Sequence, residues 1–140
     1  MKFPYWRIPV ETTEAFPRRK SIEKPLIPVR LVYNEKRVDL ITLLDSGADD
    51  CIFNAKLGEM VGIDVKKGKI GRYTGIGEGG IKAYFHNVII EVGGWRHPCY
   101  IGFSYETPLS FLGQNGFFNL YRIEFDLEKR KIELKERRLK

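Results

Sequence analysis

The chain has 140 residues, of which 43% are hydrophobic and 30% are charged, and these values are typical of a single soluble globular domain that is too small for two full lobes. No apolar run approaches the roughly 18 residues that a membrane-spanning helix needs. The first ten residues, MKFPYWRIPV, lack the apolar centre of a secretory signal. We therefore expect a cytoplasmic protein with no membrane partner.

Residues 1–23 are rich in Pro, Thr, Glu and Arg, and we expect them to form an extended arm outside the core. Apolar residues begin to alternate at Pro25, so we expect the folded domain to span residues 24–140. Turn residues at 33–37 predict a hairpin with a return strand at 38–44.

Further along the chain, short strands continue to alternate with turns. The expected elements are a helical turn at 55–61, a glycine-rich segment at 71–80, a strand–turn–strand unit at 86–103 with Gly-Gly at its turn, a single short helix after Gly113, and a C-terminal hairpin with strands at 119–125 and 131–134. Many short strands with regularly spaced turns predict an all-β, barrel-like domain.

Basic residues give the chain a net charge of +6. They gather at 18–20 and at 128–140, where glutamates alternate with them, and this mixed pattern is typical of solvated strand faces. A small nucleic-acid-binding β-barrel is a third interpretation of the chain, because Trp6, Trp95 and Tyr100 would stack on bases if they lay in a basic groove. We favour the solvated faces and do not expect nucleic acid as a partner.

The cysteines and histidines form no cluster in the sequence. Cys51 and Cys99 are far apart and lie in apolar stretches, so two buried free thiols are favoured over the alternative of a disulfide. His86 and His97 are isolated, and no Cys/His set has the spacing of metal ligands. We therefore expect no metal site and no cofactor.

The segment LLDSGADD at 43–50 carries the candidate chemistry. Asp45 directly follows a hydrophobic strand, and Gly47 permits a tight turn in which backbone N–H groups approach the carboxylate. If an identical carboxylate faced Asp45, the pair would share one proton, because two close like charges do not both ionise at low cost. One member would then activate a water while the protonated one binds a peptide carbonyl. For Asp-Ser-Gly alone, the alternative is a turn without chemistry.

Four stretches, in order, resemble the retropepsins, the small aspartic proteases of retroviruses and their cellular relatives. KPLIPVRL at 24–31 is similar to the opening strand of that family, LLDSGADD at 43–50 to the catalytic loop, GIGEGGIK at 75–82 to the flap, and TPLSFLGQN at 107–115 to the segment before the C-terminal helix. The resemblance implies a small closed barrel-like acid-protease fold with one short C-terminal helix. It also implies a symmetric homodimer, because this chain contains one Asp-Ser-Gly and a two-lobed enzyme needs a much longer chain.

The resemblance assigns roles as well. Asp45, Ser46 and Gly47 would form the catalytic loop, with the Ser46 hydroxyl bonding across to the partner's loop, and Leu112 and Gly113 would support it from behind. The substrate, a peptide or protein, would be bound by Ala48, Asp49, Asp50, Gly75, Ile76, Gly77, Leu109 and Phe111. The implied activity is that of an aspartic endopeptidase whose glycine-rich flap excludes water.

The chain departs from the family pattern in two places. Gln114 stands where many viral members have an arginine, so the expected ion pair to Asp49 cannot form, and Lys24 offers a cation without the arginine's bidentate fork. The chain also continues past Phe125, which predicts a C-terminal β-hairpin extension of the domain. The alternative function is a weakly active or inactive module of the same fold that binds peptides or proteins. The intact Asp-Ser-Gly and the glycine-rich flap segment favour the enzyme.

Overall fold

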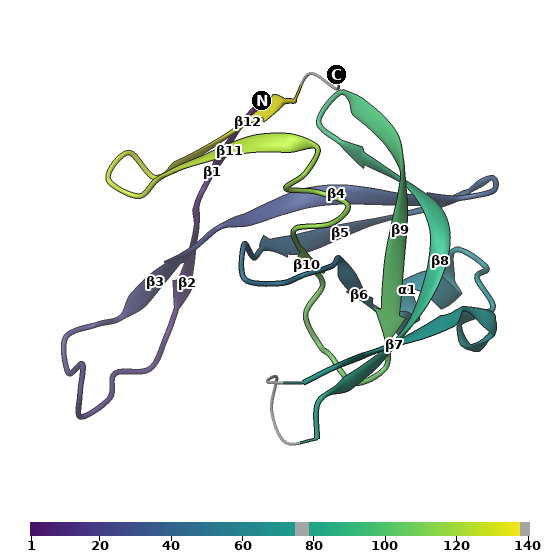
Figure 1. The fold of residues 1–140 in the computed structure, drawn as a ribbon. Coiled ribbons are helices and arrows are strands. Elements are labelled where there is room, and N and C mark those ends of the chain that lie inside the picture. The colour runs from purple at the N-terminus through teal and green to yellow at the C-terminus, as the bar shows by residue number, and fades with distance from the viewer. Residues whose placement is uncertain (75–78, 138–140) are drawn as a thin grey trace.

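The computed structural model describes residues 1–74 and 79–137, and this part of the chain is mostly β-structure, as predicted (Figure 1). The strands are β1 (Lys2–Pro4), β2 (Trp6–Pro9), β3 (Ser21–Lys24), β4 (Leu26–Tyr33), β5 (Lys36–Leu44), β6 (Ile52–Asn54), β7 (Lys69–Tyr73), β8 (Ile81–Val92), β9 (Trp95–Ser104), β10 (Phe111–Leu112), β11 (Tyr121–Asp126) and β12 (Lys131–Glu136). The helical elements are α1 (Ala55–Met60) and a 3₁₀ turn, η1 (Val65–Lys67).

Three antiparallel hairpins confirm the turns that the sequence predicts. β4 pairs with β5, β8 with β9, and β11 with β12. Each connection contains a residue in the left-handed region, namely Asn34 at φ 53°, Gly93 at φ 59° and Arg130 at φ 52°. Asn and Gly adopt this conformation at low cost, so their presence in the sequence fixes where the first two hairpins turn.

The main sheet has seven strands in the order β4-β5-β10-β6-β9-β8-β7, and an additional pairing joins β4 to β8. The sheet therefore curls back onto its first strand, as the wrapped arrows in Figure 1 show. The short strand β10 lies between β5, to which it is parallel, and β6, to which it is antiparallel. Because β5 and β10 are parallel and Leu44 pairs with Leu112, the chain leaves both strands at the same edge of the sheet.

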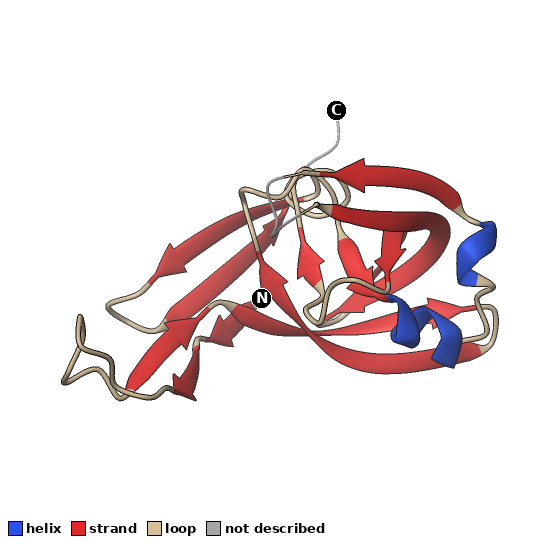
Figure 2. Cartoon of the chain, turned by 90° about the horizontal axis from the view of Figure 1, so that it is seen from below, coloured by secondary structure: helices blue, strands red, loops and turns tan. Residues whose placement is uncertain are grey.

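Figure 2 shows that the two helical elements are small beside the strands. The predicted helical turn at 55–61 is confirmed by α1, which Asn54 caps by accepting a 2.9 Å hydrogen bond from the N–H of Lys56. No helix in the described part of the chain is long and apolar enough to cross a membrane.

The predicted short C-terminal helix after Gly113 is wrong, because residues 116–120 form successive turns. Gly116 has φ +104°, which no α-helical residue adopts. The N–H of Gly116 binds Oδ1 of Asn119 at 3.0 Å, and the N–H of Phe118 reaches back five residues to the carbonyl of Gly113. A single four-residue bond, from the N–H of Tyr121 to the carbonyl of Phe117, does not continue into the regular ladder of a helix.

The first 24 residues join two small sheets. β1 pairs with β12 of the C-terminal hairpin, and β2 pairs with β3 in a hairpin that projects from the body (Figure 1). Between them, Tyr5 is buried against the core. The carboxylate of Glu23 binds the guanidinium groups of Arg7 at 2.8 Å and Arg130 at 3.0 Å, so it ties the hairpin to the C-terminal strands. The division of the chain at residue 23 stays a prediction.

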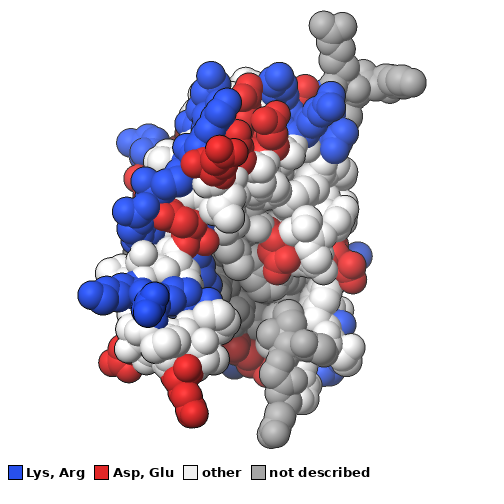
Figure 3. Space-filling view, turned by 90° about the vertical axis from the view of Figure 1, so that its left-hand side faces the viewer, with Lys and Arg blue, Asp and Glu red and all other residues white. Residues whose placement is uncertain are grey.

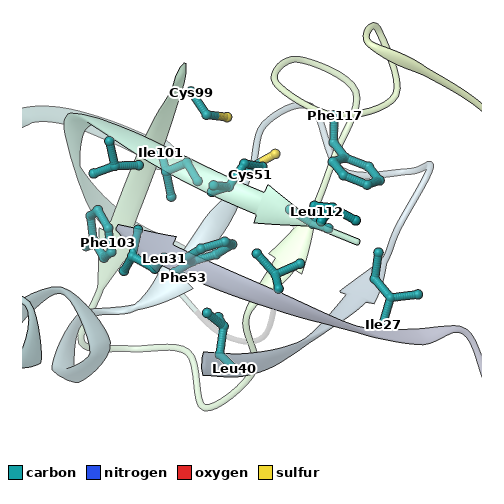
Figure 4. Packing of buried hydrophobic residues seen from close by; sticks show 14 of the residues in the cluster. Ile27, Leu31, Leu40, Cys51, Phe53, Cys99, Ile101, Phe103, Leu112 and Phe117 are labelled. Atoms are coloured by element: carbon teal, nitrogen blue, oxygen red, sulfur yellow. The ribbon is translucent and has the colours of Figure 1, made fainter. Parts of the chain in front are cut away.

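The core fills the inside of the curled sheet. Figure 4 shows side chains from β4, β5, β6, β9 and β10 meeting there, and Phe53 and Phe103 pack edge to face with ring centroids 6.1 Å apart. In β4, the buried Ile27, Val29 and Leu31 alternate with more exposed residues, which is the two-residue period that the sequence shows. The core therefore holds rigidly the strand ends from which Asp45 and Gly113 emerge.

Candidate active site

Asp45 lies at the edge where β5 and β10 end together. Its N–H donates a 3.0 Å hydrogen bond to the carbonyl of Leu112, and the N–H of Leu43 binds the carbonyl of Ser110 at 2.9 Å. Leu44 and Leu112 are buried, whereas Asp45 is only partly exposed and Ser46 and Gly47 are exposed. The buried strand thus presents the carboxylate at the surface on a fixed backbone.

A tight turn follows the carboxylate. The N–H of Gly47 donates to Oδ1 of Asp45 at 3.0 Å, and the N–H of Ala48 donates to the carbonyl of Asp45 at 3.1 Å. A Cβ at Gly47 would lie 3.3 Å from the same Oδ1, closer than nearly all real contacts of this kind. The glycine therefore allows the backbone N–H to approach the carboxylate, which is the role that the sequence predicts.

The segment after β10 supports this turn from behind. The N–H groups of Gln114 and Asn115 donate 2.8 Å hydrogen bonds to the carbonyls of Ala48 and Asp49, respectively. The side-chain amide of Gln114 donates to the carbonyl of Ser46. Gln114 thus binds the loop backbone rather than the Asp49 carboxylate.

Asp50 connects three separate segments. Its Oδ2 accepts a 2.6 Å hydrogen bond from the hydroxyl of Tyr73, and its Oδ1 accepts a 3.2 Å bond from the amide of Asn115. Burial, and then the bond to Asp50, raise the pKa of Tyr73 above its ordinary value, so the phenol stays a donor at neutral pH. Both oxygens of Asp50 therefore have partners within the chain.

A cavity of about 220 Å³ opens beside the loop. It is lined by Gly47, Ala48, Asp49, Asp50, Ile52, Tyr73, Thr74 and Phe111. Four of the predicted substrate-binding residues, Ala48, Asp49, Asp50 and Phe111, thus share one hollow with the catalytic-loop glycine. Leu109 is 52% exposed and is not part of this lining. The predicted flap residues Gly75, Ile76 and Gly77 lie outside the described residues.

The charges around the loop are unbalanced. Among residues 1–74 and 79–137, no Lys or Arg forms an ion pair with Asp45, Asp49 or Asp50, and Lys24 forms none either. On the face that Figure 3 turns to the viewer, basic and acidic side chains are interspersed, with Lys and Arg toward the top and left.

No three His, Cys, Asp or Glu side chains in the described part form a group that would hold a metal ion.

Sequence reasoning missed Tyr73, Thr74 and Ile52 as neighbours of the loop. Tyr73 ends β7 and lies 23 positions from Asp50, so neither a motif nor a periodicity links the two. The sequence does carry a signal for Ile52, because this residue lies in a short apolar run directly after the loop. The pairing of β6 with β10 is what turns it toward the cavity.

No family model matches the chain, and no curated protein matches it. Among solved structures, "EIAV protease complexed with the inhibitor HBY-793" is similar to this chain with a TM-score of 0.46 and 24% sequence identity. The match covers 65% of this chain and 82% of the other.

Proposed function

We propose that the chain is an aspartic endopeptidase of the retropepsin type, active as a symmetric homodimer in which the Asp45 carboxylates of two copies face each other. The observation that carries the proposal is the placement of Asp45. A buried strand delivers it, Gly47 donates a backbone N–H to one of its oxygens at 3.0 Å, and the cavity lined by Asp49, Asp50 and Phe111 opens beside it. The four retropepsin-like stretches support the same assignment.

The chemistry follows from pairing two such loops. Oδ1 of Asp45 is held by the N–H of Gly47, and Oδ2 has no hydrogen-bond partner in the described part of the chain, so it is free to bind a water. Two facing carboxylates would share one proton, because ionising both in close contact is costly. The ionised member takes a proton from the water that attacks the peptide carbonyl, and the protonated member donates to the carbonyl oxygen.

The substrate in this proposal is a peptide segment that lies along the loop. Ala48 and Phe111 give the cavity an apolar wall for a side chain, and the exposed Asp49 offers a carboxylate to backbone N–H groups. Asp50 keeps its bonds to Tyr73 and Asn115 and fixes the far wall of the cavity.

Substitution of Asp45 by Asn tests the catalytic assignment. Asn keeps the volume and the bond from Gly47 but does not act as a base, so cleavage of a mixed peptide library, followed by mass spectrometry at several pH values, should fall by about 10²-fold or more. Asp64→Asn is the matched control, since Asp64 is exposed and, among residues 1–74 and 79–137, its carboxylate bonds only Lys67, at 3.4 Å. It should cleave like the parent protein.

Two results would contradict the proposal. If Asp45→Asn cleaves as fast as the parent, Asp45 is not the catalytic group. If the folded parent binds library peptides but cleaves none at any pH, the chain is the peptide-binding module that the sequence leaves as the alternative.

A further inference from the structure

The two cysteines, far apart in sequence, meet behind the candidate active site. Cys51 follows the catalytic loop directly, Cys99 lies on β9, and both are buried free thiols. Figure 4 shows them on neighbouring segments, with the sulfur atoms in yellow. If Gly116 carried a Cβ atom, that atom would lie 3.1 Å from the sulfur of Cys99 and 3.3 Å from the sulfur of Cys51. Both sulfur atoms therefore contact the same glycine.

Both thiols also bind the same turn. The Cys51 thiol donates to the carbonyl of Asn115 at 3.6 Å and accepts from the N–H of Gly113 at 3.4 Å. The Cys99 thiol donates to the carbonyl of Gly116 at 3.4 Å. This turn supports the loop that carries Asp45, so any change in the two sulfur atoms acts on the site from behind.

The surroundings make the two thiols unequal. Interaction with Cys99, and then burial, raise the pKa of the Cys51 thiol well above its ordinary value. Cys99 is the more exposed of the two, at 8% against 0% for Cys51. Since the thiolate is the reactive form of cysteine, the raised pKa of the Cys51 thiol and the greater exposure of Cys99 favour Cys99 as the first thiol to react with a small oxidant.

We propose that Cys51 and Cys99 are an oxidation site, at which a hydroperoxide converts the two thiols into an intramolecular disulfide. The Cys99 thiolate attacks one peroxide oxygen, the O–O bond breaks, and a sulfenic acid forms. The leaving alkoxide or hydroxide takes up the proton that the Cys99 thiol had released and departs as the alcohol or water. The Cys51 sulfur then attacks the sulfenic sulfur, the S–S bond forms, and the sulfenic hydroxyl leaves as water with the Cys51 proton. The two sulfur atoms lose two electrons in all, and the peroxide gains them.

The disulfide would change the hydrogen bonds of the turn. Both S–H donors disappear, so the carbonyls of Asn115 and Gly116 lose their partners. The sulfur atoms must also approach to about 2.05 Å, which moves them relative to the turn that they bond in the reduced protein. Because the side chain of Asn115 holds Asp50, we expect the oxidised protein to cleave peptides more slowly than the reduced protein, and this last expectation rests on the proposed function.

The experiment treats the full-length native protein with hydrogen peroxide, alkylates the remaining thiols, and maps the peptides by mass spectrometry. The expected product is a chain that has lost two hydrogen atoms and is not covalently joined to a second chain, with Cys51 linked to Cys99 and the link reversed by dithiothreitol. Cys99→Ser is the matched variant, since serine is similar in size to cysteine and its hydroxyl can donate to the carbonyl of Gly116, but it cannot form a disulfide. It should lose no hydrogen atoms, and peroxide should not change its activity by this route.

The outcomes separate the two proposals. If both cysteines of the folded, peroxide-treated protein remain alkylatable, or if oxidation gives only sulfinic acid or linked dimers, the oxidation site is wrong whatever the activity. A mapped Cys51–Cys99 link in a protein that cleaves no peptide supports the oxidation site and contradicts the peptidase. An active parent whose cleavage rate is unchanged after complete linkage contradicts the coupling of the link to the site.

Discussion

The hydroxyl of Tyr73 donates a 2.6 Å hydrogen bond to Oδ2 of Asp50, and this bond joins the end of β7 to the loop that begins at Asp45. The two residues are 23 positions apart and line the same cavity. Since Asn115 holds the other oxygen of Asp50, the carboxylate fixes the distance between three segments of the site.

Tyr73→Phe removes this bond and keeps the ring. A hydrogen bond to a charged group contributes roughly 1.5–3 kcal/mol, so we expect urea unfolding to show a loss near the lower end of that range, because Tyr73 is partly exposed. Tyr84→Phe is the control, since the Tyr84 hydroxyl makes no hydrogen bond to any residue that the structure describes. Equal losses in the two variants would show that the Tyr73–Asp50 bond contributes nothing.

Gly113→Ala should disturb the loop from behind. A Cβ at this position would lie 2.6 Å from the carbonyl oxygen of Ala48 and even closer to that of Asp50, and both atoms belong to backbone that cannot rotate away. We expect a destabilisation of about 1–3 kcal/mol, the usual cost of overpacking, together with a loss of peptidase activity. Gly94→Ala is the control, because nothing lies within 4 Å of the added carbon. A Gly113→Ala protein as stable as the Gly94→Ala protein would contradict the close packing.

His97 should make the protein less stable in acid. Burial lowers the pKa of His97 in the folded state, while the nearby Glu136 opposes this shift. The unfolded chain therefore takes up the proton first, and the free energy of unfolding falls as the pH drops through 6.5, until the folded state is protonated too.

The measurement is urea unfolding at several pH values between about 5 and 7.5, the range over which histidine titrates. His97→Gln should flatten the curve over this range. A His97→Gln curve that parallels the parent would assign the slope to other groups.

Activity should depend on protein concentration. These 140 residues contain a single Asp-Ser-Gly, so in the proposed mechanism the paired carboxylates would exist only in a dimer, and dissociation would remove them by mass action. Specific activity over a dilution series, compared with sedimentation of the same samples, should fall in step with the dimer fraction. A monomer whose specific activity does not change on dilution would contradict the dimer and the shared-proton mechanism with it.

Local features of the sequence were enough to predict the hairpins. Asn34 and Gly93 turn the chain because their backbones adopt left-handed conformations at low cost, and the alternation in β4 sets which side chains face the core. The tight turn around Gly47 was also predicted from local features, since a carboxylate two residues before a glycine is a local arrangement.

The helix expected after Gly113 failed because a nearby contact overrode the local preference. Gly116 adopts φ +104°, and a Cβ at this position would lie 3.1 Å from the sulfur of Cys99 and 3.3 Å from that of Cys51. No property of residues 113–120 alone reveals those two neighbours.

The sequence by itself determined that the chain is mostly β-structure, where three of its hairpins turn, and that one carboxylate follows a buried strand at Asp45. Only the tertiary structure decided what surrounds that carboxylate: the bond from Tyr73 to Asp50, the support from Gln114 and Asn115, and the meeting of Cys51 with Cys99. The physical reason is the range of the interactions. Turn and strand preferences act between residues a few positions apart, whereas these contacts join segments that only the curling of the sheet brings together.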